Sequence, residues 1–479
     1  FQIDREGMRR FLEDGESTTF SVNYYPNGAG ERQASLQIGG RFGPRGRYLS
    51  TFTVNLTGVA TESLQPDTDA FGGAGDHFGS AVAIHEDLAI VGAPSDETEA
   101  GAEAGTALIF VLDATGNWKR YLKLAASDGA PDLHFGQSVS AGLDVLAVGA
   151  KDAVYIFRPE GLLWVETAKL QASDLEIGDD FGRSIALSAS GETLLVGAPS
   201  GNQDGNTAAG SAYVFTKGAE GWTEQKLTAT PAVASSNMGA AVAIHGDLLA
   251  VGLPGAESAA GRVLTYTKGA SAWELASTIE NPAPTTSTDF GTALALTEER
   301  LLVGLTDAAR LFLKTAEGDW DEETVFSDAP GIGFGGSVAL GEELILIGAE
   351  DADTEAGQAA GTAQVYIKST DQWLPRELLT AEDAAAGDRF GHAVALSGLS
   401  AMVGAPDHDG PVELGIPLDD QGSVYAYPLA APAARMDLRR LNEMVLKQGS
   451  VVEFGEVAIG ATGEATIRIT NTGDILLTG

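Results

Sequence analysis

The sequence predicts an all-β protein, a seven-bladed β-propeller with parts of a β-sandwich at its two ends. Three observations predict this fold: a recurring Phe-Gly pair, four strand-like segments after each pair, and two ends that do not share the period. The pairs recur about every 52 residues. Six copies contain Phe-Gly and the seventh has methionine in place of phenylalanine; they begin at Phe78, Phe135, Phe181, Met238, Phe290, Phe334 and Phe390.

Each repeat holds four segments of strand-like composition. The first alternates small and bulky residues, as at 80–84, and suits a strand in the crowded centre of a ring. The second is an apolar run that ends in glycine, as at 88–92, and is typical of a strand buried on both faces. The third is aromatic and β-branched, as at 154–157. The fourth begins at a tryptophan, namely Trp118, Trp164, Trp222, Trp273, Trp320 or Trp373.

The last repeat lacks a fourth strand. It ends near Tyr427 without a tryptophan, whereas residues 62–67, upstream of the first repeat, resemble residues 169–174 in a fourth strand. We therefore predict that a strand at 59–65 completes blade seven of a propeller that spans 59–430. Closure of this kind locks the first and last blades together.

A family resemblance rests on these residues. Phe-Gly followed by Gly-Ala-Pro, as at 92–94, 197–199 and 404–406, resembles the FG-GAP repeat. This repeat builds the propeller heads of integrin α-subunits and of many bacterial surface proteins. The resemblance covers roughly residues 59–430, although residues 149–151 and 304–306 lack the proline. It implies a seven-bladed propeller of the bacterial surface-protein type.

The two ends of the chain have a different pattern. Residues 1–58 and 449–479 contain alternating strands with Gly, Pro and Asn between them, as in part of a β-sandwich. Both ends resemble the immunoglobulin-like ASH, or choice-of-anchor-D, domain. The resemblance implies that 449–479 is the first half of such a domain, 1–58 its second half, and 431–448 a linker and first strand. The expected fold is thus a propeller plus an Ig-like β-sandwich split between the two termini.

Half a sandwich must be completed, because it exposes an apolar face and unpaired edges. The chain is one period of a longer polypeptide, or neighbouring subunits complement one another, or the two ends of one chain pair. The first two arrangements generate a fibre, which we expect. The predicted joint residues are Phe20, Val22, Tyr24, Leu36 and Ile38 on one side and Phe454, Val457, Ile459, Ile467 and Ile469 on the other.

Composition excludes several kinds of partner. The chain has 29 Lys and Arg against 67 Asp and Glu, a formal net charge of −38, which repels nucleic acid and anionic lipid. It has no cysteine, which excludes disulfides and thiolate metal sites. No apolar run approaches the ~20 residues of a membrane span. We expect an extracellular or cell-surface protein, with no nucleic-acid partner and no membrane insertion. Because the chain opens at Phe1 without a signal peptide, we also expect a mature or excised piece.

Acidic loops and three histidines are the candidates for metal and ligand sites. The loops at 84–88 and 244–248 lack the carboxylates of a calcium loop, so no calcium site is assigned to them. No cofactor is predicted, and calcium is left open. The metal candidates are Asp407 and Asp409, in an acidic loop that otherwise suits a solvated turn. Three histidines beside Phe-Gly could converge on a metal or ligand at one mouth of the ring, although other repeats have unrelated residues there; they are His77, His134 and His392.

No enzymatic motif is recognisable. The sequence has no nucleophile elbow, phosphate loop or His-Glu-x-x-His, so we expect no enzyme. The predicted function is a structural unit that assembles head to tail with copies of itself into a surface or matrix filament. The alternative is a cell-surface adhesin or receptor that binds a glycan or a protein on the propeller face.

Overall fold

The structure is a computed structural model. It describes residues 75–113, 116–256, 260–283, 288–327, 332–369, 372–409 and 420–429 with their side chains, and further strands near the two ends and within 410–418 by their backbone alone. The regular elements that it names are all β-strands. In the described part, no helix has the length and hydropathy of a membrane span.

The chain forms two compact units. One comprises Phe1–Glu62, Asp113–Asn117 and Ala426–Gly479. The other comprises Ser63–Leu112 and Trp118–Tyr425 and contains the propeller. Each unit is described separately below.

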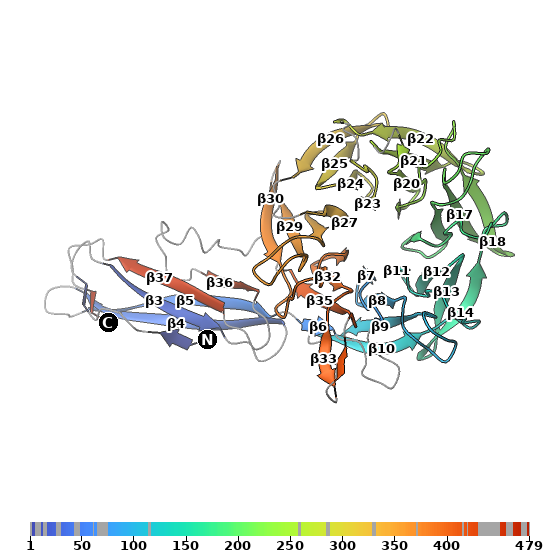
Figure 1. Cartoon of the computed structure of the whole chain (residues 1–479). Helices are drawn as coiled ribbons and strands as arrows, with labels where there is room; N and C mark the ends of the chain where they lie inside the picture. Colours follow the sequence, from blue (N-terminus) through green and yellow to red (C-terminus); the bar gives the residue numbers. More distant parts are fainter. Residues whose placement is uncertain are drawn as a thin grey trace. The chain divides into compact units, whose positions relative to one another are not determined.

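Seven four-stranded antiparallel sheets make up the propeller (Figure 1). From the centre outward, the strands of blades one to three are β7 (Ala81–His85), β8 (Leu88–Ala93), β9 (Thr106–Leu112) and β10 (Trp118–Leu124); β11 (Ser138–Gly142), β12 (Val145–Ala150), β13 (Ala153–Glu160) and β14 (Leu163–Leu170); β15 (Ser184–Leu187), β16 (Thr193–Ala198), β17 (Ser211–Gly218) and β18 (Gly221–Leu227). Those of blades four to six are β19 (Val242–His245), β20 (Leu248–Leu253), β21 (Arg262–Lys268) and β22 (Trp273–Glu280); β23 (Ala293–Leu296), β24 (Arg300–Leu305), β25 (Ala308–Lys314) and β26 (Trp320–Phe326); β27 (Phe334–Leu340), β28 (Leu344–Ala349), β29 (Thr362–Ser369) and β30 (Gln372–Leu379).

Blade seven takes its outermost strand from the beginning of the chain. Its order is β31 (Ala393–Ser397), β32 (Ser400–Ala405), β35 (Ser423–Pro428) and β6 (Glu62–Leu64). Between β32 and β35, β33 (Gly410–Glu413) and β34 (Ile416–Leu418) form a small two-stranded sheet. The innermost strands contact one another around the ring, and β31 contacts β7. Strand β6 lies within the segment 59–65 that the sequence assigns to ring closure.

The repeated motif residues hold neighbouring blades together. The residue before each motif glycine is buried, from 0% exposed at Phe135 to 2% at Phe334. Phe135 packs edge-on against Tyr155 of the third strand, with ring centroids 5.4 Å apart. A Cβ at Gly92 of the second strand would lie 1.9 Å from the carbonyl oxygen of Gly136 in the next blade. Each blade thus packs its backbone against the Phe-Gly turn of the next.

Two of the repeats without the Gly-Ala-Pro proline have a short connection after the second strand, whereas blade six, with Glu350 in that place, has a longer one. In blade two, only Lys151 and Asp152 separate β12 from β13. In blade five, Thr306 and Asp307 alone separate β24 from β25. A proline suits the longer loops that leave the sheet, because it cannot supply the hydrogen bonds of a continued ladder.

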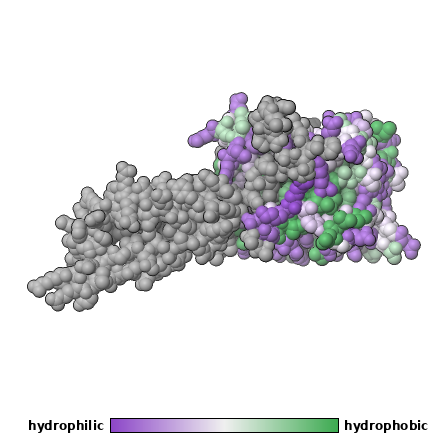
Figure 2. All heavy atoms as spheres, turned by 90° about the horizontal axis from the view of Figure 1, so that it is seen from below, coloured by the Kyte–Doolittle hydropathy of each residue, from purple (hydrophilic) through white to green (hydrophobic). Residues whose placement is uncertain are grey.

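Outer strands are exposed and irregular. Figure 2 views the described unit from the side where β10 and β14 lie, and apolar residues gather on that face. The exposed apolar side chains of this unit include Tyr121 on β10 and Leu162 between β13 and β14, 43% and 83% exposed, and the Tyr121 hydroxyl donates to the Leu162 carbonyl at 2.7 Å. The ladder of β10 shifts register between Arg120 and Leu122. Such a bulge discourages pairing of an edge with another sheet.

The other unit interleaves strands from both ends of the chain. One sheet has the order β1 (Gln2–Asp4), β3 (Ser17–Tyr24) and β37 (Gly463–Thr470), and a second has β36 (Val451–Glu456), β5 (Tyr48–Ala60) and β4 (Gly30–Phe42). A third pairs β2 (Phe11–Leu12) with β38 (Leu477–Thr478). In this structure the two ends of one chain therefore pair with each other, which is the third of the arrangements considered above. That this unit is an immunoglobulin-like sandwich stays a prediction.

Candidate functional site

The predicted joint falls on the strands that pair between the two ends. Strands β3 and β37 are antiparallel from Ser17 opposite Thr470 to Tyr24 opposite Gly463, which places Phe20 opposite Ile467. Strand β36 runs parallel to β5, with Val451 opposite Asn55. Val22 and Tyr24 are on β3, Leu36 and Ile38 on β4, Phe454 on β36, and Ile469 on β37. Val457 and Ile459 lie outside the described residues, as do the other side chains, so their packing stays a prediction.

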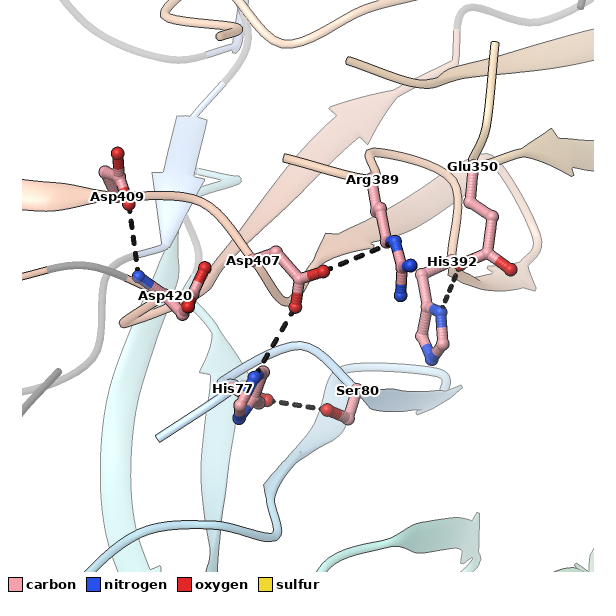
Figure 3. A network of polar contacts seen from close by, with 8 residues as sticks. All are labelled: His77, Ser80, Glu350, Arg389, His392, Asp407, Asp409 and Asp420. Carbon is pink, nitrogen blue, oxygen red and sulfur yellow. Dashed lines mark hydrogen bonds and ion pairs between the residues drawn. The ribbon is translucent and has the colours of Figure 1, made fainter. Parts of the chain in front are cut away.

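A cluster of charged side chains lies where the ring closes (Figure 3). Asp407 follows β32 of blade seven, and its carboxylate lies between a guanidinium and an imidazole: Nε of Arg389 at 3.3 Å from Oδ2 and Nε2 of His77 at 3.6 Å from Oδ1. Arg389 belongs to blade seven and His77 leads into blade one. Glu350, after β28 of blade six, places Oε2 2.5 Å from Nδ1 of His392.

These elements bring the side chains to one end of the ring. The first strand of a blade begins, and the second strand ends, at the same end, because the two strands are antiparallel. His77 and Arg389 also share a left-handed backbone, with φ of 54° and 55°. That conformation is uncommon for a large side chain, and here it precedes a buried phenylalanine in both cases.

The cluster changes the acidity of its carboxyl groups in opposite directions. Burial raises the pKa of Asp407, although Arg389 and His77 partly offset that effect. The hydrogen bond from His392 lowers the pKa of Glu350. Because each basic side chain faces a carboxylate, the arrangement can hold blades six, seven and one together through polar contacts, and it presents partly exposed polar groups to solvent.

The structure does not gather the three predicted histidines around one point. His134 places Nε2 3.5 Å from Oε2 of Glu103, whereas His77 and His392 contact Asp407 and Glu350. Asp409 accepts the backbone N–H of Asp420 at 3.1 Å through Oδ1. Within the residues that the structure describes, no group of three or more His, Asp and Glu side chains is placed to hold a metal ion.

Comparison with known families identifies the repeat. The model of the FG-GAP repeat matches residues 68–110, 118–157, 164–215 and 373–427. The protein contains FG-GAP repeats. The matches fall on blades one, two, three and seven, and the FG-GAP propeller predicted from the sequence is confirmed as a seven-bladed ring. A comparison with curated protein sequences finds no significant match.

Solved structures with a similar fold include an enzyme candidate. One is a protein from Lactobacillus plantarum, with 12% identity, a TM-score of 0.46, and coverage of 74% of this chain and 98% of that one. Another, from Bacteroides uniformis, is described as a candidate 6-phosphogluconolactonase, with 12% identity, a TM-score of 0.47, and coverage of 73% and 98%. The prediction that this FG-GAP protein is not an enzyme is therefore contradicted, and we withdraw it. At this similarity no activity is transferred to the chain.

Sequence reasoning missed a polar contact that recurs between blades of the FG-GAP propeller. An aspartate in the connection between two blades binds a tyrosine of the next blade's third strand: Asp128 with Tyr155, Asp174 with Tyr213, and Asp383 with Tyr425. A signal was present, because each aspartate stands four residues after the leucine that ends a fourth strand. His408, beside the last of these pairs, was also missed.

Proposed function

We propose that the protein is an extracellular structural unit that assembles head to tail into a surface or matrix filament through its terminal strands. The observation that supports the proposal is the ladder between β3 and β37, which joins residues 17–24 to residues 463–470. The parallel pairing of β36 with β5 adds a second contact between the same two ends. The ends of the chain are therefore complementary to each other.

Complementary ends can pair within one chain or between chains. Both pairings contain the same backbone hydrogen bonds, so the balance between them depends on protein concentration and on the effective concentration of the tethered ends. When β37 of one copy pairs with β3 of the next, each copy retains one unfilled end. A contact of this kind is heterologous and does not close, so it extends into a filament.

The charge of the chain fits an extracellular polymer. A net charge of −38 per copy keeps single chains apart at low ionic strength. Salt shortens the range of this repulsion to about 8 Å at physiological ionic strength. Copies can then approach closely enough for their terminal strands to meet.

Two truncated proteins test the proposal. Removal of residues 449–479 leaves the N-terminal strands without a partner, and removal of residues 1–58 leaves the C-terminal strands without one. The full chain should gain mass with concentration in light scattering, whereas either truncated protein alone should not polymerise. A mixture of the two should form a one-to-one heterodimer that grows no further. Polymers of a single truncated protein, or no complex in the mixture, would contradict the proposal.

The alternative function, a glycan or protein ligand bound on the propeller face, stays a prediction. Arg389 and His77, whose side chains are 49% and 37% exposed, offer polar groups to such a ligand where the ring closes.

A further inference from the structure

A polar clamp recurs in blades two and three. The Tyr155 hydroxyl donates to Oδ1 of Asp128 at 2.8 Å, and Nζ of Lys169 lies 2.6 Å from Oδ2. In blade three, Tyr213 and Lys226 make the same contacts with Asp174, at 2.9 and 2.6 Å. In each clamp, the tyrosine belongs to the third strand, the lysine to the fourth, and the aspartate to the connection that enters the blade.

Blade seven has the tyrosine and the aspartate but no lysine. The Tyr425 hydroxyl donates to Oδ1 of Asp383 at 2.5 Å. The fourth strand here is β6, whose residues are Glu, Ser and Leu. The cation is instead His408, in the loop after β32, with Nε2 3.5 Å from Oδ2 of Asp383 and Nδ1 3.0 Å from Oδ2 of Asp388.

The surroundings of His408 favour its charged form. His408 is 7% exposed and Asp388 is 2% exposed. A neutral imidazole has one N–H and can donate to one carboxylate, whereas the charged ring donates to Asp388 and keeps a second N–H for the Asp383 carboxylate, 3.5 Å away. The other groups that face it are Tyr425, edge-on at 6.3 Å between ring centroids, and the acidic Asp409. The nearby Asp407 carboxylate is engaged by Arg389 and His77.

We propose that His408 in its doubly protonated form is a pH-responsive clasp, which holds blade seven closed by bridging Asp383 and Asp388 and opens as the pH rises. The clasp ties the loop after β32 to the connection that enters blade seven, next to β35. It therefore acts on the blade whose fourth strand comes from the other end of the chain. This inference does not depend on the filament proposal.

The direction of the pH effect follows from the environment of the histidine. Burial lowers the pKa of His408, but the hydrogen bond to Asp388 and the attraction of Asp383, Asp388 and Asp409 outweigh burial and raise the pKa above 6.5. The stability that the clasp adds is fully present below the pKa of an unfolded histidine, about 6.5. It is lost as the pH rises through the pKa of the folded protein.

The test is hydrogen exchange of the full chain at about pH 6 and about pH 8.5, corrected for intrinsic rates. Between these two pH values, the equilibrium constant for the opening of β35 should rise about tenfold for each pH unit by which the pKa of His408 in the folded protein exceeds its pKa in the unfolded chain. Strand β17 is the internal control, since Lys226 keeps the same clamp charged throughout. His408→Lys should keep β35 protected at both pH values, and His408→Gln should leave it less protected at both.

A direct titration of the histidine ring by NMR completes the test. His408 should titrate above 6.5, and substitution of the exposed His245 by Gln should leave the response of β35 unchanged. The clasp is refuted if His408 titrates at or below 6.5, or if His408→Gln retains the pH response of the unsubstituted protein.

Discussion

At the scale of single residues, glycines set the distance between blades. A Cβ at Gly197 would lie 1.9 Å from the carbonyl oxygen of Gly239 in the next blade. The same relation recurs from Gly404 to Gly79, where the ring closes, at 2.1 Å. The contacting atom is backbone in both cases, so it cannot move aside as a side chain can.

Gly197→Ala should therefore lower the free energy of unfolding by about 3 kcal/mol, the upper end of the cost of overpacking. Gly218→Ala is the matched control, because its Cβ would meet only the Gly221 carbonyl oxygen at 3.6 Å. Urea unfolding of the two variants measures the difference. Equal stability of the two would show that the blades can separate freely at this point.

The sequence predicts the buried phenylalanines because their environment repeats, and it cannot predict the charged contacts in the same way. Phe78 and Phe390 occupy equivalent positions in blades one and seven, and both are 0% exposed. Asp407, in contrast, contacts Arg389 of its own blade and His77 of the next, and the repeats do not share these residues. Contacts between residues that vary from repeat to repeat depend on the packing of two blades, which no single repeat encodes.

At the scale of elements, strand positions follow closely from residue alternation. The apolar run at 88–92 becomes β8 at Leu88–Ala93, and the tryptophan at 118 begins β10. The clamps between elements are less visible, because their aspartates lie in connections of ordinary polar composition. Burial raises the pKa of Tyr213 to about 12, and the hydrogen bond to Asp174 acts in the same direction.

Tyr213→Phe should lower the free energy of unfolding by about 1 kcal/mol, the usual net value of one hydrogen bond. Tyr266, on the third strand of blade four, is the matched control: its hydroxyl is buried without a hydrogen-bond partner. Tyr266→Phe should be neutral or stabilising, since it removes a buried polar group. Thermal unfolding separates the two variants, and an equal loss in both would argue against the clamp.

At the scale of the whole molecule, ring closure was predictable and the pairing of the ends was not. A missing tryptophan in the last repeat and a matching segment at 62–67 indicate where the closing strand originates, and β6 lies there. Strands β3 and β37 would form the same ladder whether they belong to one chain or to two, so the sequence does not distinguish the two pairings. Only the structure shows that they meet within one chain here.

Pairing between chains is most directly tested with two single-cysteine variants, because the chain has no cysteine of its own. Thr19 and Arg468 are opposite each other on β3 and β37, and opposite residues of antiparallel strands are close enough for a disulfide. Thr19→Cys and Arg468→Cys are co-expressed, concentrated and oxidised; the control replaces Arg468→Cys with a cysteine at the exposed Glu220.

Neither variant of the Thr19 and Arg468 pair can form this disulfide within one chain, so the bond reports pairing between copies alone. The filament proposal predicts a covalent heterodimer that forms faster than in the Glu220 control and increases with protein concentration. A yield no greater than that of the control at every concentration would show that the terminal strands pair only within their own chain.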